Sequence, residues 1–177
     1  REGGRDALRQ REARVLQDCW RVIATSQQTA DELACDIGRP VDVVVPGTDP
    51  MRPSEPGPGH RLLCPAHLIE RKGHRTLLEA CAGLPDVPWT LELAGSRLVD
   101  PTLAARVAAD AAALGGRVRL LGSLDAEAMA AAFVRADLVV LASHYEAFGM
   151  VLTEAIAHGV PVLTSPAGAV ALLGDAA

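Results

Sequence analysis

Aromatic residues and basic charge are both scarce in this sequence. Phe, Trp and Tyr make up 3% of its 177 residues, and 17 Lys and Arg stand against 22 Asp and Glu, which gives a formal net charge of −5. Nucleic-acid-binding surfaces usually combine a basic patch with aromatic side chains on which bases stack. The composition therefore argues against nucleic acid as a partner. Hydrophobic residues reach 49%, which is enough to build a buried core.

Metal-binding cysteine pairs are also missing. The four cysteines are dispersed, and none forms a C-x-x-C pair: Cys19, Cys35, Cys64 and Cys81. A zinc site is therefore not expected. No apolar secretory signal is visible at the N-terminus. We expect buried thiols in a reducing compartment and predict a cytoplasmic protein.

One stretch lacks charge altogether. Residues 155–174 contain no Asp, Glu, Lys or Arg, but they include Gly159, Pro161 and Pro166. Glycine and proline interrupt a helix, so we interpret this stretch as a helix end, a buried strand and a turn. We do not expect a transmembrane segment here.

The common nucleotide and hydrolase motifs are absent. The sequence has no G-x-G-x-x-G after a strand, no G-x-x-x-x-G-K-[ST], no G-x-S-x-G and no D-x-D. These absences argue that the protein is not a Rossmann dehydrogenase, a P-loop NTPase or an α/β-hydrolase. D-x-D would supply the usual carboxylates for a metal-bound diphosphate, so we predict no metal site and no cofactor.

The chain divides at a proline-rich linker. Residues 50–60 hold four prolines and two glycines, and we predict a boundary between residues 55 and 56. Before the linker we expect a helix over 6–20, a strand over 21–26, a helix from Ser26 to Gly38 and a strand over 41–45.

After the linker, strands and helices alternate. We expect strands over 61–68, 89–94, 117–121, 137–143 and 161–165. Between them we expect helices over 73–84, from the Asp100-Pro101 start to residue 114, from the Asp125 cap to residue 136, and over 149–158. This order predicts an α/β fold, a doubly wound parallel sheet with helices on both faces. Ligands of such sheets bind outside the carboxyl ends of the strands.

Two segments at the expected carboxyl ends carry chemistry. Residues 70–73 (ERKG) place Arg71 and Lys72 where a helix begins, an arrangement that binds phosphate unless the two cations are simply exposed surface charges. Glu146 precedes a helix that begins near Gly149, and Glu154 lies on that helix. Two carboxylates around a helix N-terminus suit a nucleotide sugar, which has hydroxyls at both ends and phosphates between. Alternatively, Glu146 is a helix-dipole partner and Glu154 a solvent-facing residue.

Several blocks together resemble a known family. They are 71–74 (RKGH), 91–96 (LELAGS), 118–122 (VRLLG), 136–143 (ADLVVLAS) and 146–162 (EAFGMVLTEAIAHGVPV). In this order and at this spacing they resemble the donor-binding half of a retaining GT-B glycosyltransferase of family 4, also called group 1. Residues 24–26 and 43–49 resemble the end of that family's acceptor domain. The resemblance implies a Rossmann-like nucleotide-sugar-binding domain over 56–177, incomplete at its C-terminus, after an acceptor-side remnant over 1–55.

The resemblance also implies residue roles. Glu146 would be catalytic and bind hydroxyls of the donor sugar. The donor-binding residues would be Lys72, Arg71 and His67 at the diphosphate, Phe148, Gly149 and Met150 through their backbone, Glu154 at the ribose, and Ser123 and Leu124 at the base. His67 is a departure, because many members have arginine there. Arg71 substitutes for that arginine, or His67 donates a weaker hydrogen bond, or donor binding is impaired.

The expected function is transfer of a sugar, as a hexosyltransferase, from a nucleotide-diphosphate sugar to an acceptor with retention of configuration. We expect the segment in hand to bind the donor and to be inactive alone. The acceptor is a sugar, a lipid-linked glycan or a small molecule, and the sequence does not distinguish among these. A lipid-linked acceptor would require peripheral association with a membrane. The alternatives are a non-catalytic GT-B-like interaction or regulatory module and a GT-B sugar-nucleotide epimerase.

Overall fold

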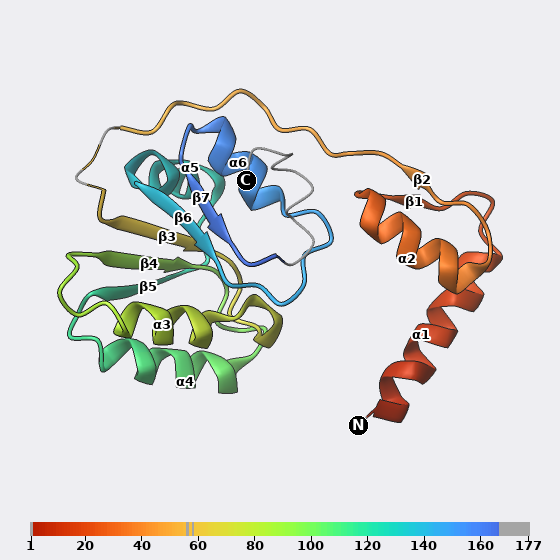
Figure 1. Cartoon of the computed structure of the whole chain (residues 1–177), viewed down its shortest axis with the longest axis horizontal. Helices are drawn as coiled ribbons and strands as arrows, with labels where there is room; N and C mark the ends of the chain where they lie inside the picture. Colours follow the sequence, from red (N-terminus) through yellow and green to blue (C-terminus); the bar gives the residue numbers. More distant parts are fainter. Residues whose placement is uncertain (1, 56, 58, 167–177) are drawn as a thin grey trace. The chain divides into compact units, whose positions relative to one another are not determined.

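The structure is a computed structural model that describes residues 2–55, 57 and 59–166 (Figure 1). The chain forms two compact units, Arg1–Gly47 and Thr48–Ala177. Neither helix nor strand forms in the described part of the linker, as its prolines predict. The predicted boundary at residues 55 and 56 stays a prediction. Of the uncharged stretch 155–174, residues 167–174 lie outside the described residues.

The first unit is small and consists of four elements. These are α1 (Glu2–Gln17), β1 (Ile23–Ala24), α2 (Gln27–Ile37) and β2 (Asp42–Val43), with β1 and β2 parallel. Ser26 caps α2 by accepting a hydrogen bond from the Thr29 backbone N–H at 3.2 Å, and Gly38 ends it with a φ of 68°. Both signals were predicted. The two strands are shorter than predicted, because the unit supplies each of them with only one neighbouring strand.

The second unit contains the predicted parallel sheet. Its strands, in the spatial order β5-β4-β3-β6-β7, are β3 (Arg61–Pro65), β4 (Thr90–Ala94), β5 (Val118–Gly122), β6 (Leu138–Leu141) and β7 (Val162–Thr164). The helices are α3 (His74–Ala82), α4 (Pro101–Ala112), α5 (Ala126–Arg135) and α6 (Met150–Ala157), and a 3₁₀ turn, η1, covers Glu70–Lys72. The predicted strand over 61–68 is three residues too long, because the pairing of β3 with β4 ends at Pro65 and Ala94.

Helices cover both faces of this sheet. Figure 1 shows α3 and α4 on one face and α5 and α6 on the other. Leu77, Leu78 and Cys81 of α3 pack with Val107 of α4 on the first face, and Phe133 of α5 and Ala155 of α6 pack with the strands on the second. The α/β class and the predicted layers are therefore confirmed.

The expectation of buried thiols holds for only part of the cysteines. Cys64 and Cys81 are buried, and burial raises the pKa of the Cys64 thiol to about 12. Cys35 is exposed and Cys19 is half-buried, so the expectation is wrong for these two. They belong to the small first unit, which buries few side chains of its own.

A short strap ties the chain before β3 to the second unit. Residues 52–55, which we call the strap, bond to α5 and to the end of α6. The backbone N–H of Ser54 donates to the His158 carbonyl at 2.7 Å, and that of Glu55 donates to the Val134 carbonyl at 2.9 Å. The buried His158 ring lies 2.5 Å from the Arg52 carbonyl through Nδ1 and stacks on Phe133 at 5.1 Å.

Strands β3 and β6 are also joined where they begin. Asp137, directly before β6, accepts backbone hydrogen bonds from His60 and Arg61 at 2.9 Å, and the Arg61 guanidinium approaches its other oxygen to 2.7 Å. These donors lower the pKa of the Asp137 carboxyl from 3.8 to about 2, with the Arg61 side-chain hydrogen bond as the largest cause. The carboxylate thereby fixes the pairing of the two strands at their amino ends.

We expect Asp137→Asn to lower the free energy of unfolding by about 1–3 kcal/mol at pH 7, because several hydrogen bonds to a charged group weaken together. A carboxyl group with a lowered pKa stabilises the folded state above its unfolded-state pKa. The difference between wild type and variant should therefore shrink as the pH falls from about 4 to about 2. Chemical denaturation across this range measures it. Asp110→Asn, which breaks an exposed pair with Arg75, is the control and should change stability by less than about 1 kcal/mol. Equal losses from both variants would contradict the assignment.

Candidate functional site

The site forms where the segments after two neighbouring strands meet. β3 pairs with β6 in register, with Leu62 opposite Leu138 and Leu63 opposite Val139. The turn η1 follows β3, and the loop 142–149 follows β6, so both lie at the carboxyl edge of the sheet. The His144 backbone N–H donates to the Arg71 carbonyl at 2.7 Å, and the Arg71 guanidinium donates to the Tyr145 carbonyl at 3.1 Å. The two segments that the sequence singled out are therefore in direct contact.

Their contact requires a glycine. Gly73, between η1 and α3, has a φ of 62°, and a Cβ built on it would lie 1.9 Å from the Ala142 carbonyl oxygen. Any larger residue would push the two backbones apart in addition to straining its own. The position of Lys72 relative to the loop after β6 therefore depends on this glycine.

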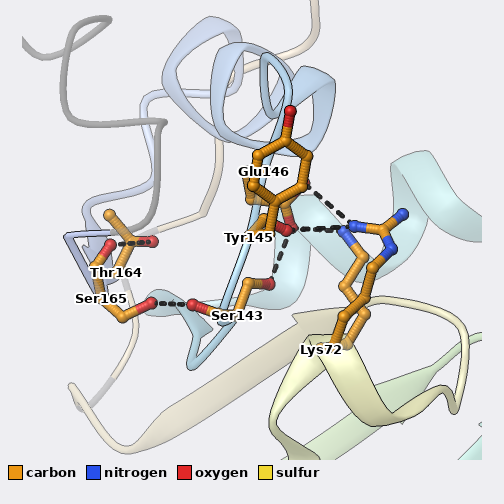
Figure 2. A network of polar contacts seen from close by, with 7 residues as sticks. Lys72, Ser143, Tyr145, Glu146, Thr164 and Ser165 are labelled. Atoms are coloured by element: carbon orange, nitrogen blue, oxygen red, sulfur yellow. Dashed lines mark hydrogen bonds and ion pairs between the residues drawn. The ribbon is translucent and has the colours of Figure 1, made fainter. Parts of the chain in front are cut away.

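Glu146 lies at the centre of the contact. Its side chain is buried, with 6% of the residue exposed. Oε1 forms an ion pair with Lys72 Nζ and accepts a hydrogen bond from Ser143 Oγ at 2.7 Å, while Arg71 Nη1 lies 3.9 Å from Oε2 (Figure 2). A buried carboxylate is costly unless it is paired and hydrogen-bonded, and here it is both. The structure thus brings the predicted residues Arg71, Lys72 and Glu146 together.

A helix N-terminus opens beside the loop. α6 begins at Met150 after Gly149, whose φ is 89°, and no side chain caps it. The first backbone N–H groups of a helix lack partners within it and attract anions. Two of the residues predicted to bind the donor through their backbone flank Gly149: the Phe148 side chain is buried, and the Met150 side chain is exposed to solvent.

Among the described residues, no hydrogen bond or ion pair joins Glu154 to Lys72 or Glu146. Glu154 is half-buried on α6, and burial raises the pKa of its carboxyl, an effect that the nearby His158 opposes. In the described part of the chain, Glu154 forms no ion pair with Lys or Arg.

The remaining predicted residues lie at the ends of β3 and β5. His67 is exposed, and its Nδ1 accepts a hydrogen bond from the Ser96 backbone N–H at 3.0 Å, just after β4. Ser123 is exposed and Leu124 half-buried directly after β5. All of them lie at the carboxyl edge, as the alternating strands and helices predict. Sequence reasoning missed the roles of the Ser143 hydroxyl and the Tyr145 carbonyl. A polar residue ending an apolar strand was the one available signal for Ser143.

Comparison with known proteins identifies the family. Residues 51–172 match the model of the family described as glycosyl transferases group 1, which is more than half of the chain. The chain belongs to this family. A D-inositol 3-phosphate glycosyltransferase of Pseudarthrobacter chlorophenolicus is 30% identical over 177 residues, covering 89% of this chain and 42% of the relative. A glycogen synthase of Mycobacterium tuberculosis is 48% identical over 58 residues, which cover 33% of this chain and 13% of that enzyme.

Solved structures share the fold and confirm its GT-B character. HepE of Anabaena, in complex with UDP and glucose, is 25% identical with a TM-score of 0.80, over 94% of this chain and 51% of that one. Sucrose-phosphate synthase of Thermosynechococcus elongatus is 28% identical with a TM-score of 0.76, over 91% and 44%. This family member thus spans about half or less of the relatives that it matches.

The described residues contain neither a helix that could span a membrane nor a metal-binding cluster. No helix within them has the length and apolar character needed to span a membrane. No cluster of three or more His, Cys, Asp or Glu side chains in the same residues is arranged to hold a metal ion.

We expect Gly73→Ala to destabilise the protein by more than the strain at its own φ, because the new Cβ also collides with the Ala142 carbonyl. Left-handed strain alone is worth about 1–2 kcal/mol. Gly159→Ala is a matched control, since Gly159 has a φ of 70° and a Cβ there meets nothing within 4 Å. Thermal and denaturant unfolding of both variants measure the difference. Equal destabilisation would show that the close approach of the two loops is unimportant.

Proposed function

We propose that the full-length protein transfers a sugar from a nucleotide-diphosphate sugar to an acceptor with retention of anomeric configuration, and that this segment binds the donor. The observation that carries the proposal is the buried Glu146 carboxylate paired with Lys72 beside the uncapped start of α6. Membership of the glycosyl transferases group 1 family supports transfer, and the resemblance to retaining members supports retention.

The charges suit a nucleoside diphosphate. Lys72, Arg71 and the N–H groups at the start of α6 offer positive charge and hydrogen-bond donors within one small region. We assign the diphosphate to Lys72, Arg71 and the backbone of Phe148, Gly149 and Met150. His67 accepts a bond from Ser96 through Nδ1, so its other ring nitrogen would be the one that faces a phosphate.

The carboxylates suit the hydroxyl groups at the two ends of the donor. Glu146 is the catalytic residue of this proposal and binds the sugar, while Glu154 binds the ribose and Ser123 and Leu124 lie against the base. The HepE structure with UDP and glucose supports a donor of this class. Two cations and a helix N-terminus can balance a diphosphate, so we propose a reaction that needs no metal ion. We further propose that the enzyme is cytoplasmic. Its acceptor is a sugar, a lipid-linked glycan or a small molecule.

A second candidate is a GT-B-like module that no longer transfers sugar. One observation favours it, because His67 occupies a position where many family members have arginine. The experiments below distinguish the two, since such a module has no turnover to lose.

We expect Glu146→Gln and Glu154→Gln to affect different steps in the full-length protein. A hydrogen bond to a charged group is worth about 1.5–3 kcal/mol. If Glu146 binds the sugar more strongly in the transition state, its loss lowers turnover about 10-fold to 150-fold. Nucleoside diphosphate affinity should not fall, because this substitution removes no proposed phosphate ligand and frees Lys72 from its ion pair. Glu154→Gln should instead weaken binding of the nucleoside diphosphate itself, because the ribose is present whether or not the sugar is attached.

Calorimetry with UDP, GDP and ADP, together with donor turnover, measures both effects. Glu79→Gln is the control, since this glutamate is 73% exposed on α3 and should change neither quantity. The assignment of sugar to one carboxylate and ribose to the other is wrong if both variants lose nucleotide affinity equally. If neither variant changes either quantity, the site itself is wrong.

Lys72 permits a direct test, because it is the only lysine among the 177 residues. Its side chain is 16% exposed and ion-paired, so amine reagents should modify it slowly. We expect saturating UDP, or GDP or ADP if one of these is the donor nucleotide, to slow that modification further. Mass spectrometry of the peptide that carries Lys72 measures the rate, with the α-amino group as an internal reference. An unchanged rate at Lys72 with all three nucleotides would remove it from the diphosphate site.

A further inference from the structure

The two oxygens of the Glu146 carboxylate have different surroundings. Oε1 accepts from Ser143 Oγ at 2.7 Å and pairs with Lys72 Nζ. Oε2 has only the more distant Arg71 guanidinium, 3.9 Å away, among the described residues (Figure 2). One oxygen is thus held from inside the protein, and the other is available to accept a hydrogen bond from a ligand.

The two groups that hold Oε1 are not equivalent. Lys72 carries its charge on a long side chain with several rotatable bonds, and the proposed function assigns that charge to the diphosphate. Ser143 is 1% exposed and has a single short side-chain torsion. The Ser165 hydroxyl donates to the Ser143 carbonyl (Figure 2), and the Ser165 backbone N–H donates to the Leu141 carbonyl at 3.0 Å. Ser143 is therefore anchored to the ends of β6 and β7, whatever Lys72 does.

We propose that Ser143 is a positioning residue that fixes the rotamer of Glu146 so that Oε2 faces the donor sugar. The inference rests on the proposed function of Glu146. Because the Ser143 hydroxyl is buried and directed at Oε1, it acts through Glu146 and does not touch the ligand. When the diphosphate draws Lys72 away, the Ser143 hydrogen bond remains and keeps the carboxylate in place.

Ser143→Ala in the full-length protein should lower kcat about tenfold, which corresponds to about 1.4 kcal/mol. Its affinity for UDP should stay within about twofold of wild type, because Lys72 and the start of α6 are unchanged. Ser143→Thr, which retains a hydroxyl, should recover most of the lost turnover. Thr102→Ala is the control, because it removes an exposed hydroxyl on α4 that takes no part in the proposed site. It should leave kcat within about twofold of wild type.

A double-mutant cycle separates positioning from general damage. If Ser143 acts through Glu146, Ser143→Ala should have almost no further effect on kcat in a Glu146→Ala background. Additive losses, or a Thr102→Ala variant that is as slow as Ser143→Ala, would overturn the inference. So would unchanged kcat in a folded Ser143→Ala variant while Glu146→Gln remains slow. Wild-type protein that binds none of UDP, GDP and ADP and shows no transfer would instead overturn the proposed function, and this inference with it.

Discussion

The parallel pairing of β3 with β6 is the constraint on which this domain depends. The two strands are far apart in the sequence, yet their register brings Arg61 to Asp137 at one edge of the sheet and Lys72 to Glu146 at the other. The first pair fixes the strands where they begin, and the second occupies the segments that follow them. A slip in this register would disturb both at once, because residues shift together along a strand. Structural stability and the geometry of the site thus share one origin.

The charges at the site are balanced before any ligand arrives. A carboxylate as deeply buried as Glu146 would be strongly destabilising if it were left alone, and Lys72 with Ser143 compensates for that cost. Under the proposed function, an incoming diphosphate would compete for Lys72 and so change the surroundings of Glu146. Recognition of the phosphates and recognition of the sugar would then be coupled through this one carboxylate.

Features that depend on neighbours along the chain could be predicted from the sequence. The caps Ser26, Asp100 and Asp125 each accept the predicted type of backbone hydrogen bond, since a cap needs only residues three positions apart. The alternation of strands and helices predicted the fold class, and the rule that ligands bind at carboxyl ends selected Lys72 and Glu146. These predictions needed only the order of the elements.

Features that depend on register and close packing could not be predicted. The sequence contains no signal that Arg61 meets Asp137, because that requires the alignment of two strands separated by most of a domain. The approach of Gly73 to the Ala142 carbonyl and the bond from Ser143 to Glu146 depend on distances of a few ångströms. The ends of strands could not be predicted either, because pairing with a neighbouring strand decides where a strand stops. The strand predicted over 61–68 ends at Pro65, where its pairing with β4 ends.

The strap has a consequence for the modular use of such domains. Residues 52–55 lie in the proline-rich segment, yet they bond to the ends of α5 and α6 and share a buried histidine with them. A chimera joined at residue 56 would replace the strap with a foreign segment, and the bonds to His158 and Val134 would form only if that segment followed the same path. Crossing over between Gly47 and Thr48, where the compact units divide, keeps these bonds. Exchange of the second unit between related proteins should therefore take place upstream of the proline-rich segment, where the compact units divide.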